Sequence, residues 1–92
     1  MIKSVSGSRT RQFIERTKSR FADLDEALAL QRLSELHAAT SLDSFGILSS
    51  VGLHKLKRPL RDLWSIDVNG RWRIIFKFKA GDAYEVEIID IH

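Results

Sequence analysis

The sequence contains no cysteine, only one proline and no long hydrophobic run. Without cysteine, the chain can form neither a disulfide framework nor a metal site with cysteine ligands. The first four residues are not followed by an apolar stretch long enough for a signal peptide, and no segment is apolar enough to cross a bilayer. These absences leave a cytoplasmic protein with no membrane partner as the expectation.

The length and charge of the chain limit what it can be. A chain of 92 residues favours a single domain, here residues 1–92. A domain of this size supports about one layer of helices on one sheet, because it buries only a limited fraction of its surface. The net charge is +3. This excess permits an acidic partner, such as a nucleic acid or an acidic protein segment, but does not establish one.

The first half of the chain is predicted to form a short strand and two helices. Residues 2–5 have apolar ends and a polar middle, which favours a short strand, and residues 9–18 are predicted to form a charged helix. A second helix is expected to start at Asp23, with Glu26 completing a capping box, and to end near residues 39–40. Its apolar side carries Ala29, Leu30, Leu33 and Leu36, and also His37, which we therefore expect to be packed rather than catalytic.

From residue 62 onward, apolar and polar side chains alternate, which predicts a three-stranded antiparallel meander. Asn69-Gly70 and Gly81-Asp82 mark the two turns. The apolar face carries Trp64, Ile66, Val68, Trp72, Ile74, Phe76, Phe78, Tyr84, Val86 and Ile88. The helices must cover this face, so the face with Arg73, Lys77, Glu85 and Glu87 is expected to stay open.

A continuous apolar face also predicts the register of the strands, because a slip of one residue would turn every side chain over. Residues 69–71 are expected to form the first loop and residues 80–82 the second. The first hairpin then pairs Trp64 with Phe76, Ile66 with Ile74, and Asp67 with Arg73. The second pairs Phe76 with Val86, Phe78 with Tyr84, and Lys77 with Glu85. The opposite charges in these pairs support the register.

Residues 41–52 are predicted to form a loop, and the most basic stretch of the chain follows, residues 54–61 (HKLKRPLR). Pro59 holds Arg58 in an extended conformation and argues against a helix there. A basic run of this kind is most often a solvated surface. Four cations beside one histidine also suit an RNA backbone, where binding would depend on salt.

Several motifs together resemble the HigB-type toxins of the RelE-like superfamily. Residues 64–76 (WSIDVNGRWRIIF) are similar to the family's W-S-I-x-V-N-x-x-W-R-I-x-F block. Residues 81–86, residues 90–92 and the histidine-bearing stretch at residues 53–57 also fit, so the resemblance covers nearly the whole chain. It implies the RelE-like α+β fold, in which a short N-terminal strand precedes two helices packed on an antiparallel sheet.

The resemblance also implies a function. HigB-type toxins enter the ribosomal A site and cut the messenger RNA being translated, without a metal or other cofactor. Their partners are the ribosome, its messenger RNA and a HigA-type helix-turn-helix antitoxin, and they meet operator DNA only through the antitoxin complex. RNA cleavage of this kind needs a base for the ribose 2′-hydroxyl, a cation for the phosphate and an acid for the leaving 5′-oxygen.

The matched positions supply candidates for these roles. Arg73 corresponds to the family's phosphate-holding arginine, and its donor fork suits phosphate oxygens. His54 corresponds by position to the family's active-site histidine. A histidine suits acid or base chemistry because the ordinary pKa of an imidazole lies near physiological pH. Without the motif, Arg73 is equally well explained as a strand residue paired with Asp67, and a lone loop histidine is more often incidental. The RNA-binding candidates are Lys55, Lys57, Arg58, Arg61 and Lys77.

The last three residues complete the candidate set. Asp90 and His92 are two apart, so an extended chain would point them to one side, where Asp90 could orient His92 and favour its protonated form. The alternative is a frayed tail. Ile91 departs from the family, which commonly has tyrosine there. Isoleucine can neither stack on a base nor donate a proton, so this departure predicts either weaker cleavage or base positioning by another group.

Two other functions remain open at this point. A ParE-like toxin shares the fold, lacks the catalytic residues and inhibits DNA gyrase. A degenerate relative would no longer cut RNA and would only bind its antitoxin. The combination of His54, Arg73, Asp90 and His92 favours the enzyme, whereas Ile91 keeps the alternatives open.

Overall fold

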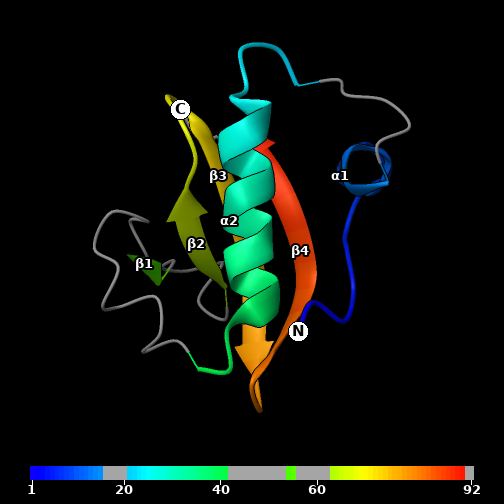
Figure 1. Ribbon diagram of the computed structural model, residues 1–92, viewed down its shortest axis with the longest axis vertical. Helices are drawn as coiled ribbons and strands as arrows, with labels where there is room; N and C mark the ends of the chain where they lie inside the picture. The colour runs from blue at the N-terminus through cyan, green and yellow to red at the C-terminus, as the bar shows by residue number, and fades with distance from the viewer. Residues whose placement is uncertain (16–20, 42–53, 56–62, 91–92) are drawn as a thin grey trace.

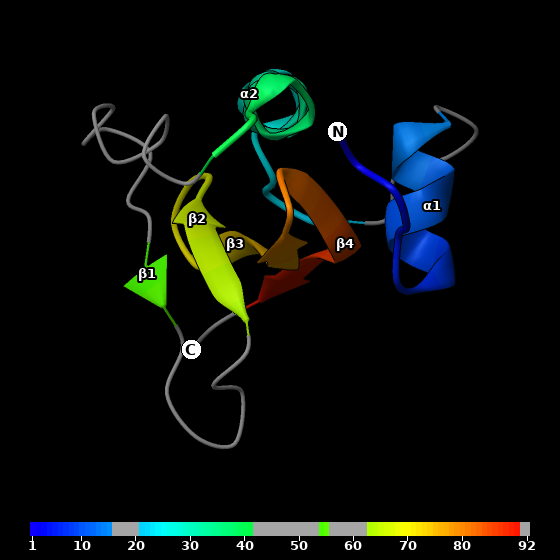
Figure 2. The same cartoon turned by 90° about the horizontal axis from the view of Figure 1, so that it is seen from below.

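The computed structural model describes residues 1–15, 21–41, 54–55 and 63–90. Two helices precede the sheet: α1 (Ser8–Ile14) and α2 (Glu26–Ala38). The strands are β1 (His54–Lys55), β2 (Trp64–Asp67), β3 (Trp72–Lys79) and β4 (Asp82–Asp90), and they form one antiparallel sheet in the order β1-β2-β3-β4. The helix α2 lies across one face of the sheet, and α1 lies beside β4 (Figure 1; Figure 2). The expected α+β class and the C-terminal meander are confirmed.

The N-terminal segment does not form the expected strand over residues 2–5. It meets the edge of β4 in two isolated parallel bridges, Ile2 with Ala83 and Val5 with Val86. Between these bridges the backbone N–H of Glu85 donates to the side-chain Oγ of Ser4 at 2.8 Å, so a side-chain contact replaces part of the backbone ladder.

The prediction of a packed His37 was wrong. This residue is exposed, and its Nδ1 accepts a hydrogen bond from the backbone N–H of Ile2 at 3.2 Å. The histidine therefore ties the N-terminal segment to the end of α2 instead of filling the core.

The helices differ from the predictions at their ends. Within the described residues α1 ends at Ile14, so the last residues expected in this helix, 16–18, lie outside them. The cap of α2 is Asp25, whose Oδ1 accepts from the backbone N–H of Leu28 at 3.0 Å. Asp23 cannot take this role because its φ of 63° places it in a left-handed turn before the helix. The end of α2 at Ala38 agrees with the expectation.

The first hairpin has the predicted register, including the cross-strand pairs of Ile66 with Ile74 and Asp67 with Arg73. The second hairpin keeps the predicted offset from Trp72 to Ile75, then shifts by one residue. Its turn contains two residues, Ala80 and Gly81, with φ values of 53° and 84°, rather than the three expected. Positive φ at both positions gives the tight turn that matches the twist of the strands.

The shift is absorbed at Glu85, which has a φ of 53° and is the extra residue of a bulge in β4. Tyr84 consequently pairs with Lys77 instead of Phe78, so its expected place on the apolar face was wrong. Ala83 is the fully buried residue there. The predicted ion pair survives, because Lys77 Nζ lies 2.8 Å from Glu85 Oε2.

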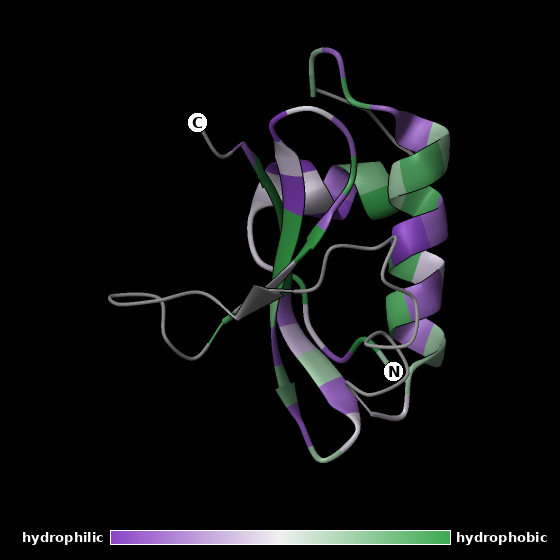
Figure 3. Cartoon of the chain, turned by 90° about the vertical axis from the view of Figure 1, so that its left-hand side faces the viewer, coloured by the Kyte–Doolittle hydropathy of each residue, from purple (hydrophilic) through white to green (hydrophobic). Residues whose placement is uncertain are grey.

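The core lies between α2 and the covered face of the sheet. Figure 3 shows the sheet edge-on, with α2 on one side of it. The fully enclosed side chains include Leu36 of α2 and Ile66, Ile74, Phe76 and Val86 of the sheet. The helix α1 is attached to β4 by Thr10, whose Oγ1 accepts from the backbone N–H of Ile88 at 3.1 Å. The predicted site residues in β3 therefore stand on a packed support.

Candidate functional site

The loop between β2 and β3 is fastened to the segment that precedes α2. The side chain of Asn69 accepts from the backbone N–H of Asp25 at 2.7 Å and donates to the carbonyl of Asp23 at 2.9 Å. Trp72, at the start of β3, is buried and donates its indole N–H to the carbonyl of Ala22 at 3.0 Å. These contacts fix the two arginines that flank Trp72, one in the loop and one in the strand.

Arg73 makes three contacts through its guanidinium group. Its Nε lies 2.8 Å from Asp67 Oδ1, and its Nη1 donates to the carbonyls of Gly70 and Trp72, each at 2.8 Å. The side chain is still 27% exposed. Arg73 is therefore both the paired strand residue and an accessible cation, so the two interpretations of this residue do not exclude each other.

The contacts of Arg73 limit how it can hold a phosphate. A guanidinium offers two-nitrogen edges, either Nε with Nη2 or Nη1 with Nη2. Because Nε and Nη1 are both engaged, each edge has one nitrogen already occupied. No contact with the described residues engages Nη2. The amino group at Nη2 is consequently the part of Arg73 available to an anion in this arrangement.

Asp90 is held by a residue that the sequence did not single out. Its Oδ2 lies 2.9 Å from Nε of Arg71, and the Arg71 guanidinium lies over the ring of Trp72, 5.5 Å from its centroid. Asp90 is also the cross-strand partner of Trp72. The signal that could have found Arg71 is its position in the loop, since the register places the residue before Trp72 beside the end of β4.

The structure does not bring Asp90 and Arg73 together. Arg73 pairs across the sheet with Ile89, whereas Asp90 pairs with Trp72, so the two residues fall on opposite faces by strand alternation. Two arginine–carboxylate pairs thus flank Trp72 at one end of the sheet. Lys77, further along β3, is exposed and paired with Glu85.

The other predicted site residues can be placed only in part. The backbones of His54 and Lys55 form β1, where His54 pairs with Ser65 of β2, and Ser65 pairs in turn with Ile75 of β3. This register places the His54 backbone in the row of Ser65 and Ile75, two residues along the strands from Asp67 and Arg73. The predictions for Lys57, Arg58, Arg61, His92 and the departure at Ile91 fall outside the described residues.

Asp90 borders a surface hollow of about 410 Å³. Its lining includes Arg71, Trp72, Arg9 and Phe21, with the Arg9 guanidinium 4.7 Å from the centroid of the Phe21 ring. Sequence analysis also missed Arg9, because nothing in its local pattern reveals that α1 packs beside the end of β4.

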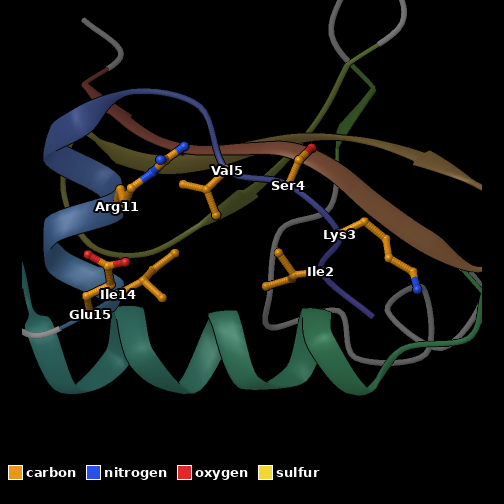
Figure 4. Close-up of a pocket in the computed structure, with 7 residues that line it drawn as sticks. All are labelled: Ile2, Lys3, Ser4, Val5, Arg11, Ile14 and Glu15. Atoms are coloured by element: carbon orange, nitrogen blue, oxygen red, sulfur yellow. The ribbon is translucent and has the colours of Figure 1, made fainter.

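A second hollow, also of about 410 Å³, lies between the N-terminal segment and α1 (Figure 4). Its lining includes Ile2 and Val5 from the segment and Arg11, Ile14 and Glu15 from α1 and the residue after it. None of the predicted site residues lines this hollow.

Among the described residues, no group of three or more histidine, aspartate or glutamate side chains is placed to hold a metal ion. In the same part of the chain, no helix combines the length and the apolar character needed to cross a membrane.

Comparison with known proteins gives two matches. Residues 8–92 match the family model described as the RelE-like toxin of the type II toxin–antitoxin system HigB. The chain is also 48% identical over 40 residues to a Proteus vulgaris protein named Endoribonuclease HigB. That stretch is 44% of this chain and 44% of the relative, so the match spans less than half the length of either protein.

Proposed function

This chain belongs to the HigB-like family of RelE-like toxins from type II toxin–antitoxin systems, and on this premise we propose that it is a ribosome-dependent endoribonuclease. It cuts messenger RNA in the ribosomal A site and thereby inhibits translation. The name of the Proteus vulgaris relative, an endoribonuclease, supports cleavage of RNA.

The observation that carries this proposal is the fixed but accessible guanidinium of Arg73. Three contacts hold it at one end of the sheet, and 27% of its side chain remains exposed. A cation held in place before the substrate arrives stabilises developing negative charge without reorganising during the reaction. Arg73 is suited to the phosphate at which the RNA is cut.

The proposed reaction uses groups of the chain itself. A base takes the proton of the ribose 2′-hydroxyl, and the 2′-oxygen attacks the adjacent phosphorus. The bond from phosphorus to the 5′-oxygen breaks, and an acid protonates that oxygen, which leaves a 2′,3′-cyclic phosphate and a 5′-hydroxyl. We assign the phosphate contact to Arg73 and the proton transfers to His54 and His92, with Asp90 in the role of orienting His92. In this scheme cleavage is metal-independent.

Binding and control of the toxin complete the proposal. Lys55, Lys57, Arg58, Arg61 and Lys77 contact the backbone of messenger or ribosomal RNA. A HigA-type helix-turn-helix antitoxin neutralises the toxin, and operator DNA is bound only through their complex.

A direct test uses purified ribosomes programmed with a defined messenger RNA. The wild type is expected to cut inside the A-site codon. Arg73→Ala is expected to lower the rate of cutting at least about 100-fold, as when one oxyanion donor is lost. Arg11→Ala is the matched control, because it removes an exposed arginine that lines the other hollow. Equal cutting of free RNA would contradict ribosome dependence. Intact RNA together with inhibited DNA gyrase would favour the ParE-like alternative.

A further inference from the structure

Asp67 stands at the point where Arg73 is fixed. It is the last residue of β2 and the cross-strand partner of Arg73, and its Oδ1 lies 2.8 Å from Arg73 Nε. Its own carbonyl accepts from Nε of Arg32 at 3.3 Å, and Arg32 is a buried residue of α2. The backbone of Asp67 is therefore tied to the helix layer while its side chain reaches the arginine on the other face.

Different nitrogens of the Arg73 guanidinium hold the side chain in place and remain available to a phosphate. Nε and Nη1 are used for holding, by the Asp67 carboxylate and by two carbonyls of the hairpin. Because the guanidinium is planar, fixing these two nitrogens also fixes the position of the third, Nη2. An arginine without such support would distribute its long side chain over many rotamers.

We propose that Asp67 is a positioning residue for RNA cleavage, which holds Arg73 so that its Nη2 amino group meets the phosphate undergoing attack. This inference rests on the proposed function. The two N–H bonds of Nη2 then contact phosphate oxygens from one nitrogen. Asp67 does not itself touch the RNA.

The negative charge of Asp67 predicts opposite effects of its removal on RNA binding and on the rate of cleavage. A carboxylate beside a phosphate-binding arginine weakens the attraction of that arginine for an anion. Removing it should therefore leave RNA binding unchanged or make it tighter. At the same time the loss of alignment should slow the chemical step, because catalysis depends on positioning. Lower kcat with an unchanged or lower KM is the expected pattern.

The ion pair is a weak candidate for a purely structural role. The side chains of Arg73 and Asp67 are 27% and 38% exposed, and ion pairs at such exposure contribute little to stability. The loop is fastened separately through Asn69 and Trp72. The protein is therefore expected to stay folded when Asp67 is replaced.

The test compares Asp67→Ala with Asp67→Asn on programmed ribosomes under single-turnover and steady-state conditions. We expect Asp67→Ala to lower kcat at least tenfold without raising KM, and Asp67→Asn to lower it as well, because the amide keeps the size of the side chain but not the charge that pairs with Arg73 Nε. Glu26→Ala is the control, since it removes an exposed carboxylate on α2, across the sheet. In an Arg73→Ala background, Asp67→Ala should cause no further loss, because no guanidinium is left for Asp67 to position.

Three results would overturn the inference, and they can be told apart. If the wild type cuts and Asp67→Ala cuts with the same kcat, the positioning role is wrong while the proposed function stands. If the wild type cuts no RNA, both are wrong. An NMR measurement of solvent exchange at the Arg73 Nε–H checks the ion pair without activity, and exchange should be faster in Asp67→Ala than in the wild type. Equal exchange in the two proteins would also contradict the proposal.

Discussion

The two faces of the sheet are held by different forces. On the covered face Ile66, Ile74 and Phe76 are completely buried against the helix layer. On the other face the pairs Asp67–Arg73 and Lys77–Glu85 keep between 27% and 55% of their side chains exposed. Burial of apolar surface stabilises far more than partly exposed ion pairs do. Stability therefore depends mainly on one face, and the other carries charges available for chemistry.

The open face is not uniform along its length. Near its middle, Ser65 and Ile75 are only 2% and 8% exposed, whereas the charged pairs lie on either side of them. The accessible charges are thus divided into two groups. One group, at the β2–β3 loop, contains Arg73, and the other, near the β3–β4 turn, contains Lys77.

The largest effect is expected from the covered face. Phe76→Ala should lower the free energy of unfolding by about 3–5 kcal/mol, because it leaves a cavity in the core. Urea denaturation measures this change. Phe78→Ala is the control, since Phe78 lies two residues along the same strand and is only partly buried, so its loss should be clearly smaller. Equal losses at the two positions would contradict the difference in burial.

Next in size is the effect of releasing Asp90. Arg71→Ala removes the contact of 2.9 Å between Arg71 Nε and Asp90 Oδ2. Cleavage is expected to fall roughly tenfold, since a misaligned group costs rate, while stability changes by less than about 1 kcal/mol for so exposed a pair. The cleavage rate and the thermal unfolding temperature are measured on the same preparation of each variant. Arg71→Lys should recover part of the cleavage rate. An unchanged rate in Arg71→Ala would contradict a role of Arg71 in holding Asp90.

A smaller effect, of opposite sign, is expected at the β3–β4 turn. Ala80 has a φ of 53°, which costs a residue with a Cβ atom about 1 kcal/mol, so Ala80→Gly should stabilise the protein by up to that amount. Ala27→Gly is the matched control. Ala27 is exposed within α2, where the same substitution should destabilise by about 1 kcal/mol. Chemical denaturation giving the same sign for both would contradict the turn geometry.

The smallest effect should come from Lys77. Because Lys77 already pairs with Glu85, Lys77→Ala should weaken binding to programmed ribosomes only a few-fold and reduce the salt dependence by less than one released counterion. Binding titrations at several salt concentrations measure both quantities. A loss as large as that of Arg73→Ala would mean that the two charged groups of the open face do not differ in role.

The register of the first hairpin could be predicted in full because it depends on residues close together in the sequence. Alternation defined the apolar face, and Asn69-Gly70 located the loop, so the partners of Ile74 and Arg73 followed. The second hairpin could be predicted only up to Ile75. Alternation does not reveal a bulge, and the extra residue at Glu85 depends on a two-residue turn with positive φ at Ala80.

The candidate site was predictable to a different extent. The motif named Arg73, and the register gave its pairing with Asp67, but the two carbonyl contacts of Nη1 follow only from the folded loop. The register predicted that Trp72 pairs with Asp90 and so placed Arg71 near Asp90, but the contact of the two side chains follows only from the folded loop. The same holds for the cap of α2, since Asp23 and Asp25 are chemically alike and only backbone conformation separates them.

Cleavage of messenger RNA during translation, with Arg73 at the phosphate, is tested by mapping messenger RNA 5′ ends within minutes of controlled expression, for the wild type and for Arg73→Ala. We expect new ends inside translated codons that disappear in the variant and when translation is blocked. Arrested growth with intact messages in the wild type would contradict the proposed function.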